Sequence, residues 1–133
     1  MFFDHRVTVP ANTTQASPHR ETLPLDAGTV TQVDVVFPPG PAGLLHVTIW
    51  QGAAQLWPSN GDGSFASDAE TLSWAEDFDL LQPPHELTAV CWNDDDSYPH
   101  SAVLRFALKR RRDMGLVDTA LDAIRALGRS GGQ

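Results

Sequence analysis

Prolines interrupt this sequence so often that no long helix fits into most of it. All ten prolines lie within the first 99 of the 133 residues, and six of the ten glycines share that region. Proline removes a backbone donor and glycine favours turns, so both break regular elements. Between the breaks, apolar and polar residues alternate, most clearly in residues 29–37 and 45–50. This period of two is typical of strands with one buried face.

Nine segments have the length or the alternation of short strands, and two of them are weak. They are residues 2–9, 22–25, 29–37, 45–50, 54–57, 71–74, 77–81, 85–92 and 102–108. Seven to nine strands, with turn signals every roughly 8–12 residues, indicate an all-β sandwich or barrel. We favour an antiparallel β-sandwich of jelly-roll-like form. The length suits one domain, which we place at residues 1–108, with the polar segment 11–18 as a potential arm.

The net charge of −8 is divided unevenly along the chain. Residues 1–108 carry three basic and fourteen acidic side chains, whereas residues 109–133 carry six basic and three acidic ones. Four of the basic residues form the run Lys109, Arg110, Arg111 and Arg112. An acidic body is repelled by nucleic acid, but a basic extension attracts a negatively charged partner. The run is either a solvated linker that keeps the body and the following segment apart or a contact with another protein, and nucleic acid contact is the less favoured alternative.

After the basic run, the apolar period changes to that of a helix. Met114, Val117, Leu121 and Ile124 follow a three–four spacing, which predicts a C-terminal amphipathic helix. A helix of about fifteen residues is marginal alone in water. Its apolar face therefore has to pack on the body, on a partner or on other copies. We assign these four residues, together with the basic run 109–112, to the binding of neighbouring subunits.

No catalytic or cofactor motif emerges from the sequence. Cys91 falls on the apolar face of its segment, which predicts a buried structural cysteine rather than a nucleophile with His85 or His100 as its base. The five histidines lack the paired spacing of a zinc site. An enzyme would need a cleft that joins His46, His85 or His100 to carboxylates. We therefore expect no catalytic residue, no cofactor and no enzymatic activity.

Two acidic loops contain oxygen ligands of the kind that calcium prefers. The candidate ligands are Asn60, Asp62, Asp68, Asp94 and Asp96. Neither loop has the spacing of an EF-hand. Asp and Asn are also common in turns, where they form local hydrogen bonds with the backbone. We therefore predict two solvated turns without a metal, and keep calcium as the weaker alternative.

Two of the four tryptophans, Trp50 and Trp92, fall on the faces opposite the apolar sets of their segments. Exposed aromatic side chains of this kind bind sugar rings or other proteins. The alternative is that both indoles fill the edges of a sandwich whose two faces are partly covered. The sequence leaves a protein interface and an edge-filling role equally open, and sugar binding by these indoles is less favoured than either.

Five short segments within residues 8–108 consist of turn and strand-edge residues. They are VPANTT at 9–14, VFPPGPAGL at 36–44, QLWPSN at 55–60, WNDD at 92–95 and YPH at 98–100. Together they resemble a family of small, β-rich structural proteins of tailed bacteriophages and related proviruses. The resemblance implies a component of the virion head or tail without enzymatic activity. The basic run and the predicted helix lie outside the matched part.

These observations favour a non-enzymatic assembly protein of a tailed-phage virion. Its partners would be other virion proteins and copies of itself, and it would join the virion during assembly in the host cytoplasm. The alternative is a carbohydrate-binding β-sandwich, assisted by calcium, that uses Trp50 or Trp92. No apolar run approaches the roughly 20 residues of a transmembrane helix, and no secretory signal pattern opens the sequence. We therefore expect no membrane partner.

Overall fold

The computed structural model describes residues 1–110, which form eight strands. The strands are β1 (Phe2–Val9), β2 (His19–Pro24), β3 (Gly28–Phe37), β4 (Leu45–Gln51), β5 (Ala54–Trp57), β6 (Glu70–Leu80), β7 (Glu86–Asn93) and β8 (His100–Arg110). No helix within these residues is long and apolar enough to cross a membrane. The predicted helix, with Met114, Val117, Leu121 and Ile124, lies outside the described residues, as do Arg111 and Arg112.

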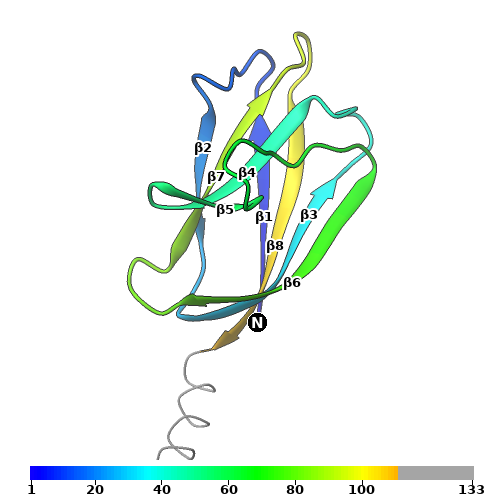
Figure 1. Ribbon diagram of the computed structural model, residues 1–133. Coiled ribbons are helices and arrows are strands. Elements are labelled where there is room, and N and C mark those ends of the chain that lie inside the picture. The colour runs from blue at the N-terminus through cyan, green and yellow to red at the C-terminus, as the bar shows by residue number, and fades with distance from the viewer. Residues whose placement is uncertain (111–133) are drawn as a thin grey trace, which may run out of the picture.

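The strands form two antiparallel, four-stranded sheets (Figure 1). One sheet has the order β1-β8-β3-β6, and the other has the order β2-β7-β4-β5. Buried side chains from both sheets belong to one apolar cluster, which makes the fold sandwich-like. The all-β class and the antiparallel pairing predicted from the sequence are confirmed.

The alternation seen in the sequence determines which side chains fill this core. In β3, Val33, Val35 and Phe37 are each at most 1% exposed, and every second residue of β4 from Leu45 to Ile49 is buried as well. Full burial of one such side chain contributes roughly 1.5–3 kcal/mol relative to exposure. The core therefore supplies the main force that holds the two sheets together.

Side chains also connect the sheets at both edges. At one edge, the Nε2 atom of His5 on β1 lies 2.9 Å from the carbonyl oxygen of Pro24 on β2. At the other edge, the indole N–H groups of Trp57 on β5 and Trp74 on β6 donate to the same carboxylate oxygen of Glu76, at 2.7 and 3.0 Å. No motif marks Glu76 in the sequence, and the only available signal is that it shares a strand face with Trp74.

Most strand bounds differ from the predictions by one or two residues, and three differences are more informative. The separate segments 71–74 and 77–81 belong to one strand, β6, because both pair with β3 along its length. Strand β2 begins at His19, three residues earlier than the alternation suggests, because its first residues pair with β7. Strand β8 continues to Arg110, which lies opposite Gly28. The first two residues of the basic run are therefore part of a strand.

Candidate functional site

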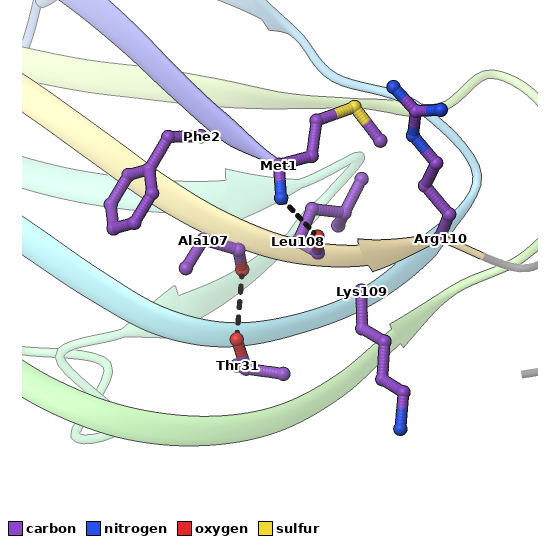
Figure 2. Close-up of a pocket in the computed structure, with 7 residues that line it drawn as sticks. All are labelled: Met1, Phe2, Thr31, Ala107, Leu108, Lys109 and Arg110. Atoms are coloured by element: carbon purple, nitrogen blue, oxygen red, sulfur yellow. Dashed lines mark hydrogen bonds between the residues drawn. The ribbon is translucent and has the colours of Figure 1, made fainter. Parts of the chain in front are cut away.

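The two described residues of the basic run lie at the end of the molecule where β1 begins and β8 ends. Lys109 and Arg110 line a depression of about 500 Å³ together with Met1 and Phe2. Figure 2 shows the Lys109 and Arg110 side chains pointing to opposite sides of β8, with the Arg110 side chain on the side of Met1. The Phe2 side chain is 64% exposed. Lys109 and Arg110 are exposed too, and neither forms an ion pair with the described residues. We call this surface the Phe2 end; it comprises Met1, Phe2, Thr31 and residues 107–110.

The main chain of the Phe2 end is paired, although its side chains are open to solvent. The Met1 amino group lies 3.1 Å from the Leu108 carbonyl oxygen, and the Leu108 N–H donates to the Met1 carbonyl at 2.7 Å. Strand β3 passes so close that a Cβ atom on Gly28 would lie 2.2 Å from the Lys109 carbonyl oxygen. These contacts fix the backbone that presents Phe2 and the two cationic side chains.

The opposite end of the sandwich is closed by hydrogen bonds that converge on Asn93. This side chain is 1% exposed. Its Nδ2 atom donates to the carbonyl oxygens of Val9 and Tyr98 at 3.2 and 3.0 Å, and its Oδ1 atom accepts the Asp95 N–H at 3.0 Å. The Asn93 backbone N–H donates to the Thr13 carbonyl at 2.9 Å. One buried amide therefore joins β1, β7 and two loops.

The polar segment 11–18, considered above as an arm, is held on the body at this end. The Asn12 N–H donates to the Asp95 carbonyl at 2.8 Å, and the Asn12 side chain donates to the Asp96 carbonyl at 3.1 Å. Thr13 forms an isolated β-bridge with Asn93. These bonds tie the segment to the loop that follows β7.

Several of the segments that carry the resemblance to virion proteins meet around Asn93. They are residues 9–14, 36–44, 92–95 and 98–100, and loops from these regions gather at the end opposite the N-terminus in Figure 1. The Asp94 N–H, for example, donates to the Leu44 carbonyl at 2.9 Å. We call the loops 10–18, 38–44 and 94–99, together with Asn93, the Asn93 end. The matched motifs at this end thus act as an internal cap of the sandwich.

Trp50 and Trp92 line one cleft on the outer side of the β2-β7-β4-β5 sheet. Thr48 and Val90, which pair across β4 and β7, lie between the two tryptophans along the strands and form the floor. The cleft has a volume of about 210 Å³. Its rim consists of residues from two chain segments: Gln15, Ala16, Pro18, Arg20, Gln55, Gly61, Asp62 and Gly63. We call this site the tryptophan cleft.

Neighbouring side chains fix both indoles of the tryptophan cleft. The Trp50 Nε1 atom donates to Thr48 Oγ1 at 2.9 Å. Trp92 stacks on His46, with ring centroids 5.0 Å apart and ring planes within 7° of each other. The Trp92 N–H and the Arg20 guanidinium make no hydrogen bond with the described residues. Neither group is fully buried, because every fully buried side-chain nitrogen or oxygen atom in residues 1–110 has a hydrogen-bond partner. Both donors are therefore available to a ligand.

Beside the cleft, Ser64, His46 and Asp94 form a hydrogen-bonded chain. His46 Nδ1 lies 2.8 Å from Ser64 Oγ, and His46 Nε2 lies 3.0 Å from Asp94 Oδ2. The order is that of a hydrolase triad, and many hydrolases use the N–H after the serine to bind the oxyanion. Here that N–H belongs to Phe65 and donates to the Val47 carbonyl at 2.9 Å. We therefore interpret the chain as a clip that ties two loops to β4.

The calcium candidates are not gathered into one site. Asn60 donates to Asp62 at 3.3 Å, while Asp68, Asp94 and Asp96 each form hydrogen bonds elsewhere. Within residues 1–110, no group of three or more His, Cys, Asp or Glu side chains is placed to hold a metal ion. The five candidate ligands are thus not brought together as one calcium site within the described residues.

Two carboxylates in these turns are stabilised in their ionised form. Hydrogen bonds from backbone N–H groups, led by that of Ala42, lower the pKa of Asp68. The Ser97 N–H and then the His100 side chain lower the pKa of Asp95. These contacts satisfy oxygen atoms that a bound cation would otherwise use, which is the turn chemistry expected from the sequence.

Cys91 is fully buried, so the predicted structural position of this residue is confirmed. Burial raises the pKa of its thiol to about 12. A thiolate is the nucleophilic form of cysteine, and almost none of it forms at neutral pH with such a pKa. The two histidines considered as its base bond elsewhere: His85 to the Leu81 carbonyl at 3.2 Å and His100 to Asp95 at 2.7 Å.

No family model and no curated protein matches this sequence. Among solved structures, the chain is similar to PliG of Aeromonas hydrophila, a periplasmic inhibitor of g-type lysozyme. The two are 11% identical over 82% of this chain and 85% of that chain, with a TM-score of 0.37. It is also similar to a protein of Bacillus endospore appendages, which form a novel family of disulfide-linked pili, at 10% identity over 82% and 88% of the two chains and a TM-score of 0.33. Neither similarity bears on function at these values.

Proposed function

We propose that this protein is a non-enzymatic structural component of a tailed-phage virion, a head or tail accessory protein that binds neighbouring subunits. The Phe2 end carries this proposal. It combines an exposed phenylalanine with two cationic side chains that have no ion-pair partner among the described residues. Residues 1–108 are strongly acidic. The surface of a neighbouring copy is therefore electrostatically complementary to the Phe2 end.

The chain continues from the Phe2 end into the residues assigned to subunit contact. Strand β8 ends there at Arg110, and the remaining 23 residues, 111–133, contain two more arginines of the basic run and the apolar set Met114, Val117, Leu121 and Ile124. We propose that these residues and the Phe2 end contribute to one contact region. Contact with nucleic acid through residues 109–112 remains the less favoured alternative.

The topology supports the same class of protein. We infer a jelly roll, because the strand orders 1-8-3-6 and 2-7-4-5 divide eight strands between two sheets. Viral capsid domains are among the proteins built on that fold. Folds of this kind also serve unrelated functions, so the Phe2 end and the family resemblance carry more weight than the topology.

The direct test is the protein content of tailed particles from a strain that carries the gene. Particles purified on a density gradient should contain the protein at a constant ratio to the other virion proteins, as measured by quantitative mass spectrometry. Its absence from intact particles would overturn the proposal.

A truncated chain tests which part makes the contact. It should end after Arg110, because a chain that ends at 108 loses the pairs of Lys109 with Thr29 and of Arg110 with Gly28. We expect residues 1–110 to keep the β-rich circular dichroism spectrum and to be incorporated poorly into particles. A full-length chain with Lys109→Gln and Arg110→Gln should show an intermediate loss. Normal incorporation of both variants would place the contact elsewhere.

A further inference from the structure

We propose that the tryptophan cleft is a binding site for neutral carbohydrate, a function separate from subunit contact. The cleft lies on the outer side of the β2-β7-β4-β5 sheet and shares no residue with the Phe2 end. A glycan could therefore bind to a protein whose Phe2 end is occupied by a neighbour. The argument rests on the shape of the cleft, its polar groups and the way its walls are held.

The shape of the cleft suits one ring of a longer glycan. Trp50 lies opposite Thr88, and Trp92 lies opposite His46, which precedes Trp50 by four residues on β4. This offset places the two tryptophans roughly 13 Å apart along the sheet. The volume of about 210 Å³ is below the roughly 300–1,000 Å³ of sites that enclose a drug-sized ligand. Both indoles are partly exposed, and an indole face is a good surface for the C–H face of a sugar ring.

The polar groups of the cleft match hydroxyl groups, which both donate and accept hydrogen bonds. Arg20 supplies N–H donors that form no hydrogen bond with the described residues. Asp62 supplies a carboxylate whose one hydrogen bond within the described residues comes from Asn60. Because these two charges have opposite signs, the cleft favours no strongly charged ligand. The net charge of −8 also repels acidic glycans and nucleic acid. A neutral sugar is therefore the best fit.

The walls of the cleft are in place before any ligand arrives. Thr48 fixes the Trp50 indole, and His46, itself held by Ser64 and Asp94, supports Trp92. The Gln55 side chain holds the rim, since its Nε2 atom lies 2.8, 3.2 and 3.3 Å from carbonyl oxygens of the loop 58–63. A preformed site loses less conformational entropy on binding, so modest contacts suffice for measurable affinity.

A glycan array with the full chain tests the proposal. The array should present neutral hexoses, N-acetylhexosamines and deoxyhexoses beside uronate and sialylated glycans, and titration calorimetry should follow with the best ligand. We expect binding to neutral glycans. Trp92→Ala should weaken it about tenfold or more, as loss of a central aromatic anchor does, and Arg20→Gln should weaken it less.

The controls separate binding from folding. Phe2→Ser alters an exposed aromatic residue of the Phe2 end, which shares no residue with the cleft, and should leave glycan affinity unchanged. Arg20 is exposed and tolerates substitution without loss of fold. Absence of any bound glycan, binding of acidic glycans alone, or unchanged affinity in both Trp92→Ala and Arg20→Gln would overturn the proposal. Particle incorporation would be unaffected by each of these results, so the two functions fail independently.

Discussion

The two ends of this sandwich are built from opposite kinds of surface. At the Asn93 end, loops rich in Asn, Asp and Thr bond to one another around an amide that is 1% exposed. At the Phe2 end, the main chain is paired, but an apolar ring that is 64% exposed stands beside two cations without an ion-pair partner among the described residues. The first end uses its polar groups within the chain, whereas the second leaves its side chains for contact with another molecule.

The comparison of the two ends also shows that a distinctive sequence segment can serve the fold rather than binding. Several of the turn-rich segments on which the resemblance to virion proteins is based converge on Asn93 and close the sandwich. The inconspicuous Phe2 is the large apolar side chain left open beside the basic run. In this chain, the segments that stand out in the sequence are therefore not the ones whose side chains are free to bind another molecule.

Asn93→Ala is the substitution expected to have the largest effect on the free energy of unfolding. It removes both Nδ2 donors and the Oδ1 acceptor, and leaves the Val9 and Tyr98 carbonyls without those bonds. Each buried polar group left unsatisfied costs about 1–3 kcal/mol, so we expect a loss of about 2–4 kcal/mol in urea unfolding. Asn12→Ala, which loses one exposed side-chain bond, should cost about 0.5–1.5 kcal/mol. Equal losses for the two variants would mean that Asn93 does not organise this end.

At the Phe2 end, the most sensitive position is a backbone one. Gly28→Ala would force a methyl group to within 2.2 Å of the Lys109 carbonyl oxygen. Overpacking of this kind costs about 1–3 kcal/mol, and it should separate β3 from the end of β8. Gly61→Ala is the matched control, because a Cβ atom there meets nothing within 4 Å. A Gly28→Ala protein as stable as its control would show that the last residues of β8 are loosely held.

Acid should loosen the Asn93 end before the core. The pKa of Asp95 is lowered below its ordinary value of 3.8 in the folded protein, so its contacts stabilise the fold above pH 3.8. That stabilisation is lost as the pH falls through the folded pKa. The melting temperature should therefore drop below about pH 4, and Asp95→Asn should melt lower at pH 6 and show a flatter decline in acid. Parallel curves for the two proteins would contradict this role of Asp95.

The strands could be predicted from the sequence because alternation is a local consequence of one shared core. The alternation of Val33, Val35 and Phe37 predicts both the strand and the face of it that is buried. The Asn93 network could not be predicted, because its amide bonds to Val9, 84 residues earlier in the chain. The outward faces of Trp50 and Trp92 follow from the same alternation, but their union in one cleft depends on the register of β4 against β7.

Phe2→Ser should have the smallest effect on stability and a visible effect on association. A ring that is 64% exposed adds little to the core, so the free energy of unfolding should change by less than about 0.5 kcal/mol. If the protein self-associates through the Phe2 end, sedimentation velocity over a concentration series should show weaker association for this variant. Tyr98→Ser is the matched control, because Tyr98 is 67% exposed at the Asn93 end. An equal loss of association in both variants would mean that any exposed aromatic residue promotes association. The Phe2 end would then not be the specific contact surface.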